Sequence, residues 1–476
     1  MDTKKLRQKI LDLAIHGKLV PQDPNDEPAS VLLERIRAEK ERLIAEGKIK
    51  RSKKSATSDT PHYENVPFEV PEGWCWCSIS DICSKIGSGS TPRGSNYAEH
   101  GIPFFRSQNV YNDGLVYDDI KYISEDVHKS MIGTEVLPKD LLLNITGGSL
   151  GRCAVVPSDF ERGNVSQHVC ILRTVQVLPE YLHCFIISDY FSDTMILSGS
   201  GREGLPKYSL EAMMIPIPPL AEQSRIVTSI DQWISFIDSI ESSTTDLLQS
   251  VQVAKSKVLD LAIHGKLVPQ DASDEPASEL LKRINPKAIA SCDNPQYGKV
   301  PSSWVISMVG EVFTINPKTH VEDDTDAAFV PMTCVSDGYS NTFEYECRKW
   351  GDIKKGFVHF QENDVAVAKI SPCLENRKSV VFHDLPNGIG AGTTELNVFR
   401  CAEILPEYAL FYFKSQFFIC SCAGTYNGVV GQQRVAKSFI QELPIGIPPY
   451  KEQMRIVSKV NDLFSQLDTI EKSLQA

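Results

Sequence analysis

Three polar segments in the first half of the chain carry residue types suited to contact nucleic acid. They are 87–92 (GSGSTP), 102–109 (IPFFRSQN) and 144–152 (NITGGSLGR). Backbone N–H groups of a Gly-rich turn can cradle a phosphate. Arg can donate two hydrogen bonds to guanine, and Asn or Gln can pair with adenine through two. The same residue types also build ordinary turns, so composition alone leaves both interpretations open.

The polar residues in and beside these segments are our candidate DNA contacts. In the first half they are Arg106, Gln108, Asn109, Asn144, Thr146, Arg152, Gln167 and Lys207. The second half has no NITGGSLGR at the matching place, but 369–373 (KISPC) and 375–378 (ENRK). Its candidates are Lys318, Lys369, Ser371, Arg377, Lys378, Thr394, Arg434 and Lys437. The two halves therefore differ at this place; under the family resemblance described below, this difference implies that they read different base sequences and that the site is asymmetric.

Signatures of catalysis are missing from the sequence. There is no GxxxxGK[ST] loop for ATP, no HExxH, no GxSxG and no Asn/Asp-Pro-Pro-aromatic motif. His16 and His264 recur in HGKL at a predicted helix end, which favours a structural role. We expect no catalytic residue, no metal site and no cofactor on this chain.

A long internal repeat must position these segments. LDLAIHGKLVPQD occupies 11–23 and returns unchanged at 259–271, a spacing of 248 residues. Three further motifs recur in the same order. VPEGW returns as VPSSW, LPEY returns unchanged, and IPIPP returns as IGIPP, with EQ and RIV after both copies of the last motif. So long a period excludes a solenoid and predicts two whole domains with a shared connector.

Composition sets further bounds. No run of 18 apolar residues exists, so no membrane span is expected, and the start MDTKKLRQK is not a secretory signal. Thirteen cysteines without a CxxC pair favour free thiols in the cytoplasm over a zinc site. The net charge of −12 is unusual for a nucleic-acid-binding protein. A basic run at 48–54 is either a solvated linker or a phosphate contact.

A helical pattern follows each Ile-Pro-Pro. From Ile226 to Leu261 apolar residues alternate at spacings of four and three, including Trp233 and Leu247, with a polar lapse at Thr244. We predict a helix from about Glu222 to His264, roughly 60 Å long. A seam of this length needs a partner helix.

The partner is expected to be divided between the chain ends. Residues 456–474 repeat the first part of the seam, and residues 6–13 repeat its last part. The pattern predicts a circular plan cut inside the second of two antiparallel helical arms, with a pseudo-twofold axis. Residues 3–16 would then pack end-on against 450–476.

The expected fold class is α+β, with two mixed α/β globular bodies joined by the arms. Short β-like runs such as 140–145, 153–156 and 364–368 are bounded by Gly, Pro and Asn. Each body has one aromatic-rich helical stretch, at 181–188 and 408–415, which we assign to the core. The predicted divisions are 1–45 (completing the second arm), 46–65 (linker), 66–215 (first body), 216–290 (central arm and connector), 296–445 (second body) and 446–476 (C-terminal arm).

The order of these motifs, given twice, resembles the specificity subunits of type I restriction-modification systems over essentially the full length. That resemblance implies two target-recognition domains, each reading one half of a split double-stranded DNA site. It also implies arms that set the spacing and dock two methyltransferase subunits, and restriction subunits that join them. S-adenosylmethionine, ATP and Mg would then belong to partner subunits. Phosphate contacts made by the methyltransferase subunits would make the acidic charge of this chain tolerable.

Two other functions stay open on the sequence. One is a stand-alone DNA-binding or scaffold protein that needs no methyltransferase partner. The other is an enzyme in its own right, which would require a cofactor pocket that the sequence does not reveal. The DNA sequence recognised depends on loop geometry and DNA shape, so the sequence does not predict it.

Overall fold

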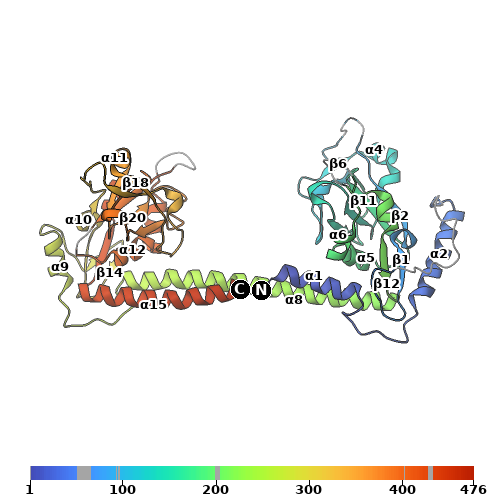
Figure 1. The fold of residues 1–476 in the computed structure, drawn as a ribbon, viewed down its shortest axis with the longest axis horizontal. Coiled ribbons are helices and arrows are strands. Elements are labelled where there is room, and N and C mark those ends of the chain that lie inside the picture. The colour runs from blue at the N-terminus through green and yellow to red at the C-terminus, as the bar shows by residue number, and fades with distance from the viewer. Residues whose placement is uncertain are drawn as a thin grey trace. The chain divides into compact units, whose positions relative to one another are not determined.

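A computed structural model describes residues 2–50, 66–92, 94, 97–198, 204–400, 403–426 and 433–475. The chain divides into two compact units, an N-terminal unit of residues 2–242 and a C-terminal unit that begins at residue 243. Most of the predicted linker 46–65, including residues 51–54 of the basic run, lies outside the described residues. Figure 1 shows the elements of each unit.

The N-terminal unit contains two four-stranded sheets. One has the order β6 (Lys121–Ile123), β3 (Ile102–Phe105), β10 (Gly163–Val165), β7 (Glu135–Val136). The other has the order β2 (Cys83–Ser88), β11 (Val169–Thr174), β8 (Leu141–Asn144), β9 (Cys153–Val155). A further pair joins β1 (Cys75–Ser78) to β12 (Met214–Ile217), and the helices are α3 (Ile79–Ile82), α4 (Glu125–Ser130), α5 (Pro179–Ile186), α6 (Asp189–Thr194) and α7 (Lys207–Ala212).

The C-terminal unit repeats the order and pairing of these ten strands. Its sheets have the orders β18 (Glu346–Lys349), β17 (Asp326–Val330), β22 (Ile389–Gly392), β19 (Val358–Gln361) and β16 (Thr314–Ile315), β23 (Leu396–Arg400), β20 (Val365–Ala368), β21 (Ser379–Val381). The pair is β15 (Val305–Met308) with β24 (Pro444–Ile447). The matching helices are α10 (Val309–Val312), α11 (Trp350–Ile353), α12 (Pro406–Lys414), α13 (Gln416–Ala423) and α14 (Lys437–Gln441). The prediction of two mixed α/β bodies is confirmed.

Long helices complete each unit. Helix α8 (Leu220–Ile263) is continuous over 44 residues and contributes to both units, which confirms the predicted central helix. Within the N-terminal unit α1 (Thr3–Ile15) runs antiparallel to the first half of α8, since Arg7 pairs with Asp238, whereas Gln22, which follows α1, donates to Glu222 near the start of α8. Within the C-terminal unit α15 (Tyr450–Gln475) runs antiparallel to the second half, since Lys255 pairs with Asp468 and Gln252 donates to Glu471. The end-on contact of 3–16 with 450–476 stays a prediction.

The heptad seam was wrong at two of its positions. Trp233 is 48% exposed and Leu247 is 51% exposed, although Ile226, Ile230 and Ile237 are buried as predicted. Ile234 packs partly buried against the core in place of Trp233.

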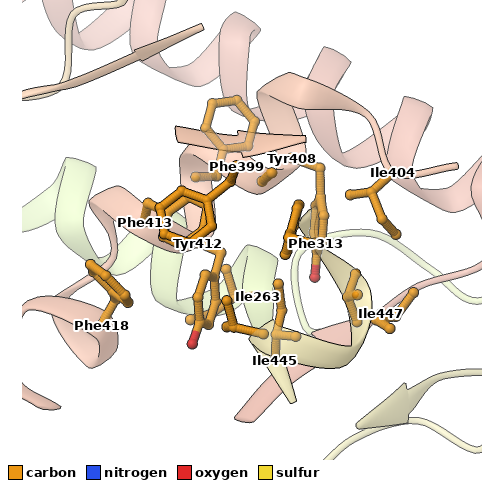
Figure 2. Packing of buried hydrophobic residues seen from close by; sticks show 14 of the residues in the cluster. Ile263, Phe313, Phe399, Ile404, Tyr408, Tyr412, Phe413, Phe418, Ile445 and Ile447 are labelled. Atoms are coloured by element: carbon orange, nitrogen blue, oxygen red, sulfur yellow. The ribbon is translucent and has the colours of Figure 1, made fainter. Parts of the chain in front are cut away.

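The aromatic helices lie in the cores, as predicted. Figure 2 shows part of the core of the C-terminal unit, in which Tyr408, Tyr412 and Phe413 of α12 pack beside Phe399 and Ile445. Helices α5 and α12 begin with Pro at the first turn, where the missing N–H costs no hydrogen bond. The hydroxyls of Tyr181 and Tyr408 donate to the carbonyls of Pro216 and Gly446, each at 2.7 Å, so these buried polar groups are satisfied.

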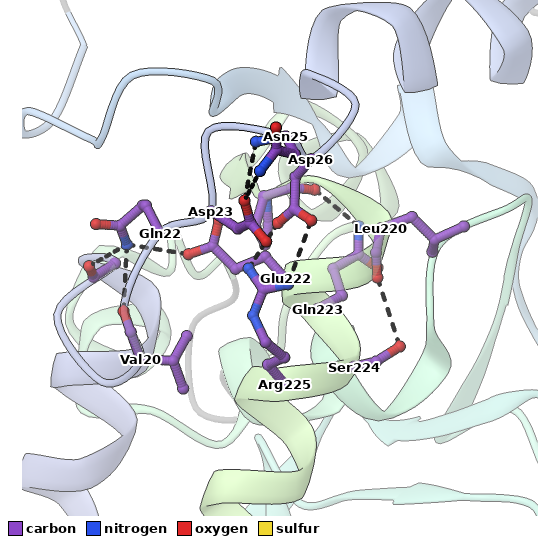
Figure 3. Close-up of polar contacts among 12 residues, drawn as sticks. Val20, Gln22, Asp23, Asn25, Asp26, Leu220, Glu222, Gln223, Ser224 and Arg225 are labelled. Carbon is purple, nitrogen blue, oxygen red and sulfur yellow. Dashed lines mark hydrogen bonds and ion pairs between the residues drawn. The ribbon is translucent and has the colours of Figure 1, made fainter.

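The repeated sequence LDLAIHGKLVPQD forms a polar joint between helical arm and globular body. Figure 3 shows the joint of the N-terminal unit, where Gln22 donates to buried Glu222 at 3.0 Å and Arg225 pairs with Asp26. The indole Nε1 of Trp74 also donates to Glu222, at 3.0 Å. In the C-terminal unit the same contacts join Gln270 and Trp304 to Glu452, and Arg455 to Asp274.

The two repeated histidines stabilise the same joint. His16 stacks on Phe68 with ring centroids 3.9 Å apart, and His264 stacks on Tyr297 at 4.9 Å. The Nδ1 atom of each lies within 2.8 Å of the carbonyl oxygen four residues earlier, on Asp12 or Asp260. The expected structural role of these residues fits this packing.

Glu452 predicts a pH-dependent contribution from the joint. Burial raises the pKa of its carboxyl above the ordinary 4.5, although hydrogen bonds from Trp304 and Gln270 act against this. Since the folded pKa exceeds the unfolded one, the folded state favours the protonated form, and this contribution to stability is lost as pH rises through the folded pKa. Glu452→Gln keeps an oxygen acceptor without a charge. We expect it to match or exceed the wild type in urea unfolding at pH 7, and to lose this part of the pH dependence.

The matched variant is Glu452→Ala, which leaves the indole N–H of Trp304 without its acceptor. It should cost about 1–3 kcal/mol at pH 7. A Gln variant as unstable as the Ala variant would contradict the role assigned to the carboxyl oxygen.

Candidate nucleic-acid interface

The candidate loops of the N-terminal unit meet where strand ends of its two four-stranded sheets come together, which we call the loop edge. Strands β3 and β10 are parallel, so their carboxyl ends place Arg106 and Ser166 side by side, and the Ser166 N–H donates to the Phe105 carbonyl at 2.9 Å. Strand β8 ends where the antiparallel β11 begins, which brings the 145–152 loop to the same edge. The Asn144 amide donates to the Ser107 carbonyl at 2.8 Å and ties the two loops together.

Four of the predicted residues carry accessible side chains on this edge. Gln167 and Lys207 are exposed, and Thr146 and Arg152 are partly exposed. The Thr146 hydroxyl lies 2.8 Å from Nδ1 of His168, which is also exposed. The Arg152 guanidinium lies 4.7 Å from the ring centroid of Tyr111, a cation–π arrangement that limits its movement.

Arg106 and Gln108 share one carboxylate. Both donate to Asp119, at 3.1 Å each, and Lys121 pairs with its other oxygen at 3.0 Å. Hydrogen bonds from Lys121, Arg106 and Gln108 lower the pKa of the exposed Asp119 carboxyl to about 2. The cluster holds the Arg and Gln side chains in fixed directions beside the loop.

Two predicted contacts in this unit are corrected. Asn109 and Asn144 are fully buried. The Asn109 amide donates to the carbonyls of Val116 and Asp118, and its oxygen accepts the Arg106 N–H at 3.1 Å. A buried amide committed to backbone partners positions the loop instead of facing a base, so we no longer include these two among the candidates for base contact.

The Gly-rich stretch 87–92 is corrected in the same way. Gly87 and Ser88 belong to β2, and the Gly89 N–H donates to the Val169 carbonyl at 3.0 Å. A Cβ at Gly89 would overlap the Val165 carbonyl. Close approach to a neighbouring strand therefore explains this glycine, and its N–H is not available for a phosphate.

In the C-terminal unit two predicted cations hold a loop. Lys378 donates to the carbonyls of Met332 and Val335, at 3.4 and 2.7 Å, and Arg377 lies over the Tyr339 ring at 4.9 Å. Buried Lys414 supports them by donating to the Gly338 and Arg377 carbonyls. Burial lowers the pKa of the Lys414 ammonium to about 7, with the Arg377 charge adding to this effect. Arg377 and Lys378 thus position the 332–339 loop in this structure, and their role as direct DNA contacts stays a prediction.

The remaining predicted residues of this unit are more accessible. Lys318 and Thr394 are exposed, and Lys369 is partly exposed. Ser371 donates to Glu375 at 2.8 Å, and Lys437 donates to the Ile315 carbonyl at 3.3 Å. Arg434 is held by Glu395 through two hydrogen bonds of 2.8 Å.

Sequence reasoning missed four residues that shape the two surfaces: Tyr111, Asp119, His168 and Glu395. Asp119 and Glu395 were missed because a search for DNA contacts favours cations and amides. An Asp or Glu opposite an isolated Arg in the equivalent loops is the signal that could have found them.

Two absences complete the description. Among the residues that the structure describes, no group of three or more His, Cys, Asp or Glu side chains is placed to hold a metal ion. Within the same residues, no helix combines the length and the apolar character needed to cross a membrane.

Comparisons with known proteins agree with this architecture. The family model for the type I restriction modification DNA specificity domain matches residues 71–249 and 301–476. The chain is 38% identical over 279 residues to the type I restriction enzyme EcoEI specificity subunit of Escherichia coli, covering 53% of this chain and 46% of that relative. It is 24% identical over 416 residues to the EcoKI specificity subunit of Escherichia coli K12, covering 85% of each.

Solved structures show the fold. A crystal structure of the HsdS subunit from Thermoanaerobacter tengcongensis matches with a TM-score of 0.53 at 16% identity, over 86% of this chain and 93% of that one. A structure from work on complex assembly of the type I R-M system matches with a TM-score of 0.59 at 16% identity, over 86% and 94%.

The chain spans about half the length of the EcoEI and EcoAI specificity subunits that it matches, 46% and 47% respectively. The family model nevertheless matches both globular units and most of their helical arms. With two matched domains, the same topology in each and loop clusters at equivalent edges, the chain belongs to the type I restriction-modification DNA specificity family.

Proposed function

We propose that the chain is the DNA sequence-recognition subunit of a type I restriction-modification complex. Its two units would read separate parts of a bipartite, asymmetric site. The observation that carries this proposal is the pairing of equal scaffolds with unequal loops. Both units have the same strand order, whereas the equivalent edges carry Thr146 and His168 in one and Arg434 and Glu395 in the other.

The chain itself would be non-catalytic. Cofactor chemistry would belong to partners: S-adenosylmethionine on methyltransferase subunits that methylate adenine, and ATP and Mg on restriction subunits that cleave. We expect two methyltransferase subunits, one for each unit, and a cytoplasmic complex. Positive charge on these partners would supplement the phosphate grip of a chain with net charge −12.

An apolar patch on α8 supports a protein partner. Trp233 is 48% and Phe236 is 58% exposed, and their rings meet edge to face with centroids 6.3 Å apart. Exposed adjacent aromatic residues are typical of protein interfaces, in which Trp contributes strongly. We assign this patch on the N-terminal unit to a methyltransferase subunit.

Methylation mapping tests the function. The full chain is expressed with its modification subunits in a host lacking other methyltransferases, and methylated adenines are located by sequencing. We expect one bipartite, non-palindromic motif. Arg152→Ala should weaken discrimination in one half of the motif only, because Arg152 lies in one unit.

Gel shifts with and without modification subunits separate the alternatives. Tight specific binding by the isolated chain would favour the stand-alone DNA-binding protein. No motif in the methylation map, with folded chain and active partners, would refute the proposed function.

A further inference from the structure

A short turn at the loop edge joins β10 of one sheet to β11 of the other. The Ser166 N–H donates to the Phe105 carbonyl at 2.9 Å, and the Val169 N–H donates back to the Ser166 carbonyl at 3.0 Å. The His168 carbonyl accepts the Ile145 N–H at 3.0 Å. Because these hydrogen bonds hold the backbone to strands on both sides, the turn has a fixed position at the loop edge.

Two side chains of this turn reach solvent. Gln167 and His168 are exposed, whereas Ser166 before them and Val169 after them are buried. The buried neighbours anchor the turn, so the two exposed side chains project from a rigid base. A recognition residue needs such support, because precise contacts require a backbone that does not move.

His168 links the Gln167 amide to the neighbouring loop. Its Nδ1 lies 2.8 Å from the Thr146 hydroxyl, and its Nε2 lies 3.4 Å from Nε2 of Gln167. Since an amide nitrogen only donates, the His168 Nε2 accepts this hydrogen bond and Nδ1 carries the ring proton, which it donates to Thr146. A glutamine amide has two N–H donors and one oxygen, so a second N–H and the oxygen remain for a further contact.

An acceptor and a donor on one planar amide match the major-groove edge of adenine. Adenine presents its N7 acceptor and its N6 amino donor there, and Gln pairs with both. Guanine presents two acceptors, thymine an acceptor and a methyl group, and cytosine an amino donor. None of these three completes both hydrogen bonds, so an amide fixed at a DNA-facing edge favours adenine.

The corresponding turn of the C-terminal unit has different chemistry. The Thr393 N–H and the Glu395 carbonyl make the equivalent backbone hydrogen bonds there, at 3.3 and 2.9 Å. These two bonds place Thr394 where Gln167 lies in the N-terminal unit. Thr394 is also exposed, but a hydroxyl lacks the paired acceptor and donor of an amide. The two-point contact is therefore a property of the N-terminal unit and not of this position in the C-terminal unit.

We propose that Gln167, oriented by His168, recognises an adenine in the half-site of the N-terminal unit. The Gln167 oxygen accepts from the N6 amino group of adenine, and the second amide N–H donates to N7. His168 and Thr146 are positioning residues that act through Gln167. This inference rests on the proposed function, because it requires the loop edge to face DNA.

The loss-of-function test uses the full chain assembled with its modification subunits. Methylation mapping of the wild type gives the motif, and dissociation constants are then measured on duplexes in which each base pair of the half-site is replaced in turn. Gln167→Ala should reduce discrimination at one A·T pair about 5- to 100-fold, in the half-site that Arg152→Ala also affects. The control is Gln296→Ala, which should leave discrimination unchanged. Gln296 is an exposed glutamine between β13 (Asp293–Asn294) and β14 (Gly298–Lys299) of the C-terminal unit.

A change of base preference tests the contact more directly. Gln167→Glu keeps the size of the side chain but replaces the amide donors by a second oxygen, and a carboxylate is suited to the N4 amino group of cytosine. We expect this variant to lose the preference for adenine and to prefer cytosine at the same position. A residue that only supported the fold would not exchange one base for another. Because Glu is of the same size, this variant also decides the question if the alanine variant does not fold.

Two further variants test the positioning residues. His168→Phe keeps a ring without a nitrogen acceptor, and Thr146→Val removes the hydroxyl at nearly the same volume. Each should reduce discrimination at the same A·T pair by a smaller factor than Gln167→Ala, without changing affinity for unrelated DNA. Thr146→Ser, which keeps the hydroxyl, should retain the discrimination of the wild type.

The outcomes separate the two proposals. Far-UV circular dichroism and a thermal melt establish that the variants fold. A folded Gln167→Ala chain that discriminates as the wild type does, or that binds all duplexes equally more weakly, would overturn this inference and leave the proposed function standing. A loss of discrimination confined to G·C pairs would overturn it as well. A wild-type chain that gives no motif with active partners would refute the proposed function itself.

Discussion

Replacement of Asp364 by alanine is expected to cost the C-terminal unit about 2–4 kcal/mol of unfolding free energy. The carboxylate is 1% exposed and accepts two hydrogen bonds from Arg400, at 2.7 and 2.6 Å, and one from the Gln361 N–H at 2.7 Å. Its loss leaves these donors unpaired beside the core. The Arg400 side chain keeps 31% exposure, so water recovers part of the cost.

Urea unfolding at neutral pH measures this effect, with Glu279→Ala as the control. Glu279 pairs with Lys282 on an exposed helix face, where ion pairs contribute less than about 1 kcal/mol. The N-terminal unit has the same arrangement in Asp140 and Arg173, and Asp140→Ala should behave alike. Equal midpoints for Asp364→Ala and Glu279→Ala would refute the structural role of the ion pair.

Substitution of Gly17 by alanine is expected to destabilise the N-terminal unit by about 3 kcal/mol, from backbone strain and overlap together. The residue has φ +65°, and a Cβ there would overlap Cγ of Pro71 and lie 2.7 Å from its Cδ. Gly47→Ala is a close control, because φ is +69° and nothing lies within 4 Å. It should show the strain alone, roughly 1 kcal/mol.

Thermal melts of both variants, with activity in methylation as a second measurement, check the difference. A Gly17→Ala cost no larger than that of Gly47→Ala would mean that the joint accommodates a methyl group. The contact of Gly17 with Pro71 would then not explain why this glycine is repeated.

Much of the fold was predictable because the repeat is long and Gly and Pro residues mark the ends of its helices and strands. The helix after Ile-Pro-Pro, the β8 and β20 strands and the two aromatic helices follow directly from periodicity. Trp233 was misplaced because a heptad count does not reveal that Ile234, the next residue, packs against the core in its place. The sheet orders were not predictable, since they depend on pairings between strands distant in sequence.

The site was predicted less well, for a physical reason. Residue type indicates what a side chain can bind, but burial decides whether it is available. Asn109 and Asn144 have amides that could pair with a base, but their N–H groups donate to loop carbonyls. Asp119 and Glu395 have the wrong sign for DNA, yet they orient the arginines beside them. The sequence does not reveal these carboxylate–arginine pairs, because they form only when the loops are folded.

The polar joint has an evolutionary consequence. Because Gln22, Trp74 and Glu222 make the same contacts as Gln270, Trp304 and Glu452, either globular body is attached by an identical connection. A gene segment exchanged between two points in the duplicated sequence would deliver a foreign body with a compatible attachment. If the proposed function holds, new recognition specificities would arise by recombination of whole bodies, in one step, while the helical arms and the partners proposed for them stay unchanged.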